Sequence, residues 1–126
     1  MADYRDLDVY KCSHQLALAI YGATGSFPDR EKYGLTSQLR RAAVSVPSNI
    51  AEGAGRGSHK DFARFLRVAV GSANELECQL LIARDLGLLD LETHQSVSEL
   101  VARTRQLLDG FIRSLRGARP RKPGNG

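Results

Sequence analysis

Residues 40–58 read RRAAVSVPSNIAEGAGRGS, and this stretch decides the fold of the chain. Its apolar residues recur every three or four positions, as on one face of a helix, and the stripe extends back to Leu35. Pro47 lies in the middle of this pattern. A proline inside a helix removes a backbone hydrogen bond and costs about 3 kcal/mol. We therefore expect a helix here whose packing against other elements offsets that cost.

A second stripe of small apolar residues lies beside the first on the same expected helix. It consists of Val44, Pro47, Ala51 and Ala54. A surface helix needs only one apolar face, and surplus apolar surface usually marks a contact between proteins. The stripe therefore predicts an interface in a homo-oligomer. The alternative is that these residues only widen the core of one subunit.

The rest of the chain carries the same helical period, and no stretch alternates with period two. A first helix is expected from about residue 7 to 24. The helix of residues 40–58 begins between 29 and 36 and ends at the glycines of 53–57. Ser58 and Asp90 have the side chains that cap helix N-termini, and they predict a third and a fourth helix. Four helices with short connections predict an all-α, antiparallel up-and-down four-helix bundle.

Length and composition predict one domain followed by a short tail. The chain has 126 residues, which suits a single compact core. We assign residues 1–116 to the bundle and 117–126 to a disordered basic tail, because the latter contain two prolines and no apolar stripe. No apolar run approaches the length of a membrane span, and the N-terminus lacks the features of a signal peptide. The expected location is therefore the cytoplasm, without a membrane partner.

Positive charge gathers in two parts of the chain. Residues 40–67 hold six basic and two acidic side chains, and residues 113–126 hold five basic and none acidic. Clustered cations attract the phosphates of RNA or DNA irrespective of base sequence. The residues expected to contact phosphates are Arg40, Arg56, Lys60, Arg64, Arg67, Arg119, Arg121 and Lys122. Aromatic residues are few, so no platform for stacking single-stranded bases is evident.

Ion pairs are expected between the second and third helices. Folding the chain back at the glycines of 53–57 brings together residues whose numbers sum to about 115. This register places Arg41 near Glu77, and Glu52 near Arg64. Glu77 has apolar neighbours on its helix and is expected to be partly buried, so it needs a paired donor. Arg41 is the predicted donor.

The residues that catalysis or metal binding requires lack the necessary spacing. No Glu-x-x-His pair occurs, and Ser45 and Ser48 have no activating His or Lys one turn away. We expect both serines to bond backbone carbonyls freed by Pro47. Cys12 and Cys78 are isolated and predict buried free thiols. The chain is therefore predicted to be no enzyme, with no metal, no cofactor and no small-molecule substrate.

Three runs of residues resemble a known family. They are YGLTSQLRRAA at 33–43, SVPSNIAEG at 45–53 and GSANELE at 71–77. They closely resemble the four-helix-bundle proteins encoded in 23S rRNA intervening sequences, over about residues 7–115. The resemblance implies a small cytosolic bundle that assembles as a ring of five. It also implies kinship with the basic accessory proteins of diversity-generating retroelements, which bind nucleic acid and a reverse transcriptase.

Two functional interpretations stay open at this point. In the first, the oligomer binds RNA or DNA phosphates through its basic surface. In the second, the bundle is a structural or protein-interaction scaffold that binds no nucleic acid. The family name records where the genes lie and does not decide between them.

Overall fold

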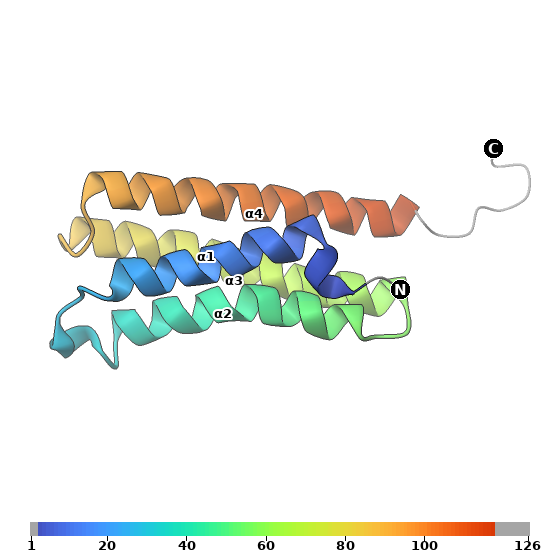
Figure 1. Cartoon of the computed structure of the whole chain (residues 1–126), viewed down its shortest axis with the longest axis horizontal. Coiled ribbons are helices and arrows are strands. Elements are labelled where there is room, and N and C mark those ends of the chain that lie inside the picture. Colours follow the sequence, from blue (N-terminus) through green and yellow to red (C-terminus); the bar gives the residue numbers. More distant parts are fainter. Residues whose placement is uncertain (1–2, 118–126) are drawn as a thin grey trace, which may run out of the picture.

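Four long helices joined by short connections make up the protein (Figure 1). The structure, a computed structural model, describes residues 3–117. The helices are α1 (Asp8–Thr24), α2 (Leu35–Ala54), α3 (His59–Asp85) and α4 (Leu91–Gly117). Two short 3-10 helices, η1 (Tyr4–Asp6) and η2 (Asp29–Glu31), precede α1 and α2. The predicted all-α four-helix bundle is confirmed.

Each long helix packs against two of the others. α2 and α4 both contact α1 and α3, so the helices form a closed square. The connections α1–α2 and α3–α4 lie at one end of the bundle, and the α2–α3 turn and the end of α4 lie at the other (Figure 1). The topology is therefore up-and-down and antiparallel.

The two predicted N-caps are confirmed. The Ser58 hydroxyl accepts a hydrogen bond from the backbone N–H of Asp61 at 3.1 Å. The Asp90 carboxylate accepts one from the N–H of Thr93 at 2.7 Å. Each cap satisfies a backbone donor in the first turn that has no partner within its helix. These contacts fix where α3 and α4 begin.

The helix α2 runs through Pro47 without a break, as predicted. The prediction for Ser45 was wrong. Its hydroxyl forms a 2.8 Å hydrogen bond with that of Ser72 on α3, because the side chain lies in the contact between the two helices. That bond also confirms the α2–α3 register, since the two residue numbers sum close to the predicted value.

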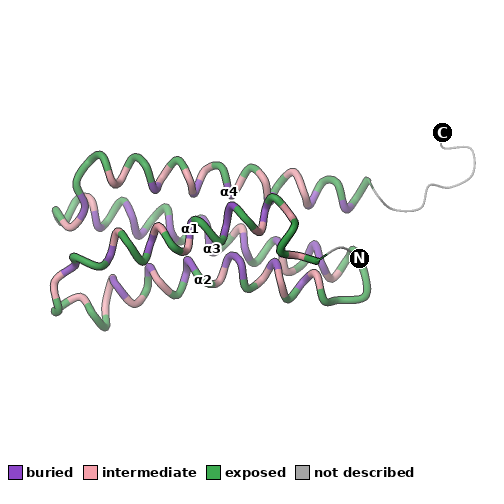
Figure 2. Tube along the Cα trace, viewed as in Figure 1, coloured by how far each residue is buried: buried purple, intermediate pink, exposed green. Residues whose placement is uncertain are grey.

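The hydrophobic core lies along the inner faces of all four helices, where Figure 2 shows the buried residues in purple. Burying a Leu, Ile, Val or Phe side chain contributes roughly 1.5–3 kcal/mol, so these faces hold the bundle together. The largest fully buried apolar side chains are Leu16, Ile20, Leu39, Val46, Ile50, Phe62, Leu66, Leu76, Leu80, Val101 and Leu108.

The structure buries one residue of the second apolar stripe of α2 and leaves the others at least partly exposed. Pro47 is buried inside the subunit, so the prediction that it touches another copy was wrong. Val44 is 41% exposed, and Ala51 and Ala54 are half-buried. A neighbour can reach Val44 and the two alanines only, and such a contact stays a prediction.

The two cysteines differ. Cys12 is buried as predicted, with its Sγ 3.2 Å from the Oγ1 of Thr104, whereas Cys78 is an exposed free thiol on α3, contrary to prediction. At the C-terminus, α4 includes Gly117, and the rest of the predicted tail lies outside the described residues. Among residues 3–117, no helix combines the length and the apolarity needed to cross a membrane.

Candidate nucleic-acid interface

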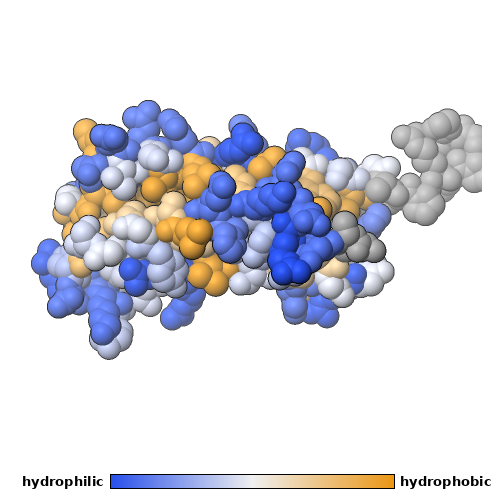
Figure 3. Space-filling view, in the orientation of Figure 1, coloured by the Kyte–Doolittle hydropathy of each residue, from blue (hydrophilic) through white to orange (hydrophobic). Residues whose placement is uncertain are grey.

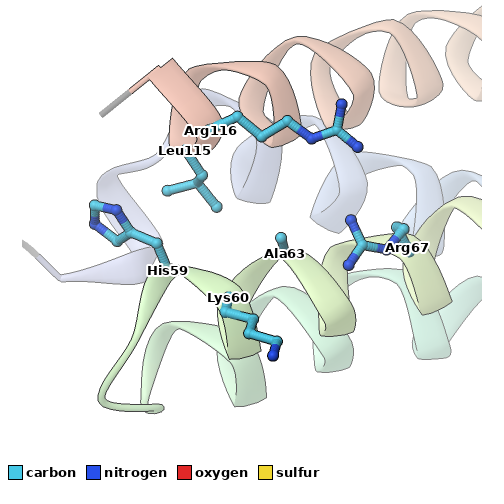
Figure 4. Close-up of a pocket in the computed structure, with 6 residues that line it drawn as sticks. All are labelled: His59, Lys60, Ala63, Arg67, Leu115 and Arg116. Carbon is cyan, nitrogen blue, oxygen red and sulfur yellow. The ribbon is translucent and has the colours of Figure 1, made fainter. Parts of the chain in front are cut away.

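A basic pocket lies where the beginning of α3 faces the end of α4 (Figure 4). It has a volume of about 290 Å³. Figure 4 shows the guanidinium groups of Arg67 and Arg116 on the same side of the pocket, and His59 at the opposite side. The lining residues are His59, Lys60, Ala63, Arg67, Leu115 and Arg116.

Helical spacing brings the α3 side chains to the pocket. Lys60, Ala63 and Arg67 follow one another at three and four positions, which places them along one stripe of the helix. Ala63 and Leu115 are each 7% exposed and belong to the contact between α3 and α4. The alanine side chain is short, so the longer cations around it border a hollow.

The electrostatics of the pocket favour an anion. Lys60, Arg67 and Arg116 carry permanent positive charges, and no carboxylate lines the pocket. The first turn of α3 also lies here, and unpaired backbone N–H groups at a helix N-terminus favour negative charge. A phosphate group fits this combination of donors in charge and in hydrogen bonding.

Two of the predicted arginines lie elsewhere, around Phe65. The guanidinium carbon of Arg56 lies 4.8 Å from the ring centroid of Phe65, and that of Arg64 lies 4.6 Å from it. Arg56 also pairs with Glu52 at 3.2 Å, and Arg64 with Asp61 at 3.6 Å. These partners hold both arginines and offset their charge, whereas Lys60 and Arg67 form no ion pair with the described residues.

The remaining predicted cations are separate from the pocket. Arg40 lies toward the other end of the bundle, where its Nε donates to the Oγ1 of Thr24 at 2.9 Å. Arg119, Arg121 and Lys122 lie outside the described residues. The structure therefore brings two of the eight predicted phosphate contacts to the pocket, Lys60 and Arg67.

Sequence reasoning missed His59 and Arg116 as pocket residues. The sequence contained a signal for each of them, because both lie at helix ends that an antiparallel arrangement brings together. In an antiparallel α3–α4 pair, the first turn of one helix meets the last turn of the other, and Arg116 lies in the last turn of α4. The register of α3 with α4, which was not predicted, brings Arg116 and Lys60 to the same pocket.

The predicted ion pairs with Arg41 and Arg64 were wrong. Glu77 is exposed on the α4 side of α3, where its Oε2 lies 3.3 Å from the Nη2 of Arg105. Arg41 is on α2 and forms no ion pair with Glu77. Glu52, in the last turn of α2, pairs with Arg56, which lies four residues on, just after the helix. The partner of Glu52 is thus a residue four positions along the chain, and not the residue on α3 that the α2–α3 register had predicted.

Within residues 3–117, no group of three or more His, Cys, Asp or Glu side chains is placed to hold a metal ion. Glu52 and Glu77 are in ion pairs, and Ser45 is bonded to Ser72. The arrangement is suited to binding an anion.

Comparison with known proteins adds two findings. Residues 5–110 match the model of a family described as 23S rRNA-intervening sequence protein. A crystal structure from Bacteroides thetaiotaomicron, described as a protein with unknown function from the S23 ribosomal protein family, has the same fold with a TM-score of 0.77. It is 24% identical, and the alignment covers 83% of this chain and 95% of that one. No curated protein matches.

Proposed function

This chain belongs to the 23S rRNA-intervening sequence protein family, and from that premise we propose that it is a non-catalytic protein that binds RNA or DNA phosphates. The proposed contact surface is the basic pocket between α3 and α4. One observation carries the proposal: three permanent cations and His59 meet in a hollow that no carboxylate lines.

Counterion release supplies the driving force for such binding. Each phosphate that a cation neutralises releases condensed counterions and adds about −0.9 to the slope of log K against log salt concentration on a duplex. Three permanent cations therefore give a slope of roughly −2 to −3 for one pocket. Affinity from one pocket is low, and repetition of the pocket in an oligomer would raise it.

Fluorescence anisotropy with a labelled duplex of about 20 base pairs, titrated at several KCl concentrations, tests the proposal. We expect Arg67→Ala and Arg116→Ala each to weaken binding and to reduce the salt slope by about one. Arg103→Ala is the matched control, because Arg103 is exposed on α4 and does not line the pocket. Absence of binding at low salt, or an equal effect of all three variants, would contradict the proposal.

A second candidate function, self-association, has support of its own in an exposed apolar group at the α3–α4 turn. Ile82 is 46% exposed, Leu86 61% and Leu91 75%. Large apolar side chains gathered in this way usually mark a protein contact. Figure 3 shows further hydrophobic surface between α1 and α4 on the face in view. We propose that copies of the chain meet through the apolar group at the α3–α4 turn, with the family resemblance implying a ring of five.

Light scattering at several protein concentrations tests self-association directly. We expect a mass above that of one chain, and a lower mass for Leu86→Lys, because a charge at the centre of an apolar contact is costly to bury. Leu18→Lys is the control, since Leu18 is 62% exposed on a different helix, α1. A single-chain mass at every concentration would refute the second candidate and leave the phosphate pocket untouched.

A further inference from the structure

A second cationic groove lies between α1 and α2 and differs from the basic pocket by its aromatic side chains. It has a volume of about 520 Å³, and eight residues line it. Two tyrosines, Tyr21 and Tyr33, lie among three cations, Lys32, Arg40 and Arg41. No carboxylate is among the lining residues.

The tyrosine rings are accessible. Tyr33 is 88% exposed and Tyr21 45% exposed, although both are large aromatic side chains. The Nζ of Lys32 lies 5.5 Å from the ring centroid of Tyr33, and the guanidinium of Arg40 lies 4.6 Å from that of Tyr21. Each ring therefore already has a cation beside it, and Tyr33 leaves most of its surface open to a flat ligand.

The groove also offers hydrogen-bonding groups. Thr36 and Ser37 are among its lining residues. The Thr36 side chain is 9% exposed, and its Oγ1 has no hydrogen-bond partner among the described residues. That oxygen has almost no accessible surface, so the hydroxyl that a ligand in the groove can reach is that of Ser37.

We infer that this groove binds unpaired nucleotides of a single strand, with a base stacked on Tyr33 and the adjoining phosphates held by Lys32, Arg40 and Arg41. Positively charged grooves that carry exposed aromatic rings bind single strands in this way, since every base has a face that can stack. A duplex keeps its bases stacked within the helix and offers only phosphates. The inference rests on the proposed function in one respect, that the ligand is nucleic acid.

The groove and the basic pocket are distinct sites. Tyr33 lies just before α2 and Arg40 near its beginning, whereas Lys60 and Arg67 belong to the beginning of α3. These two helices begin at opposite ends of the bundle (Figure 1). With a rise of 1.5 Å per residue, the two sites lie on the order of 20–30 Å apart along the bundle. Substitutions in one site therefore leave the other intact.

Anisotropy titrations that compare the binding of a 12-nucleotide oligouridine with that of a duplex of the same length test the inference. We expect Tyr33→Ala to weaken binding of oligouridine about fivefold or more and binding of the duplex less than about twofold. Tyr33→Phe is the matched control, because it keeps the ring and should keep the affinity. Tyr33 is so exposed that neither variant threatens the fold.

Two further readouts separate stacking from charge. The chain has no tryptophan and four tyrosines, so stacking of a base on Tyr33 should quench the tyrosine emission. Tyr33→Ala should leave the salt slope for oligouridine unchanged, whereas Arg41→Ala should reduce it by about 0.7.

Each outcome decides between the two sites. An equal loss on both ligands, or no loss on either, overturns the inference. Duplex binding without oligouridine binding overturns it and leaves the proposed function standing, while no binding of either ligand refutes both. If Tyr33→Ala lowers the mass of the protein in light scattering, then the groove is covered by a second copy and the inference also fails.

Discussion

Gly53 is the position where a single methyl group should destabilise the bundle most clearly. A Cβ placed there would lie 2.8 Å from the Cδ1 of Phe62 and 2.9 Å from the Cβ of Phe65. Real Cβ atoms essentially never lie within 3.0 Å of such atoms, so either the two phenylalanine side chains or the helices must shift. Phe62 cannot move freely, because it is 2% exposed and its ring packs edge-on against Phe111 at 5.2 Å.

The size of the effect follows from two opposing contributions. Overpacking a buried contact costs about 1–3 kcal/mol. Replacing Gly by Ala in a helix gains at most about 1 kcal/mol. Gly53→Ala should therefore lower the free energy of unfolding by about 1–2 kcal/mol. In Gly71→Ala, a Cβ meets nothing within 4 Å, so this variant keeps the gain without the cost.

Urea unfolding followed by circular dichroism measures both variants under the same conditions. We expect Gly71→Ala to be as stable as the unmodified protein or up to about 1 kcal/mol more stable. The difference between the two variants should reach about 2–3 kcal/mol, or several degrees in Tm. If Gly53→Ala proved as stable as Gly71→Ala, then the close approach of α2 and α3 at Gly53 would be refuted.

Three further predictions concern caps, ion pairs and pH. Ser58→Ala should lower the free energy of unfolding by about 1 kcal/mol in the same assay, because α3 loses its N-cap, and Ser58→Asp should restore it. Arg105→Met should cost less than about 1 kcal/mol, since its pair with Glu77 is exposed, and Arg41→Met should cost no more than that. The pKa of Asp90 is lowered because its carboxylate accepts the N–H of Thr93 in the first turn of α4. Since the folded-state pKa lies below the unfolded value of about 3.9, the stabilisation is present above that value. This stabilisation is lost as pH falls through the folded-state pKa. Between pH 6 and pH 3, the free energy of unfolding should therefore fall less in Asp90→Asn than in the unmodified protein.

The helices were predictable because their signals are local. The 3.6-residue period, the caps at Ser58 and Asp90, and the glycines after α2 each act within one or two turns of the backbone. The α2–α3 register was also predictable, since one short turn connects these helices and leaves little freedom in how they align. The Ser45–Ser72 hydrogen bond shows that this alignment was nearly right.

The candidate sites were only partly predictable. Lys60 and Arg67 were expected to contact phosphate from charge alone, but Arg116 reaches them from a helix that is distant in the sequence. The groove of Tyr33 was missed for a similar reason. Aromatic residues are few in the sequence, yet two of the four tyrosines line one groove, Tyr21 from α1 and Tyr33 from the turn that precedes α2.

The sequence by itself determined that this chain is an all-α bundle with two capped long helices and an excess of positive charge, because these properties depend on neighbours in the chain. Only the tertiary structure decided which charges meet. It paired Glu77 with Arg105 and not Arg41, buried Pro47 within the subunit, and separated the basic pocket from the tyrosine groove. The physical reason is that a helix turns its residues to all sides, so a side chain's partner depends on which neighbouring helix that side faces.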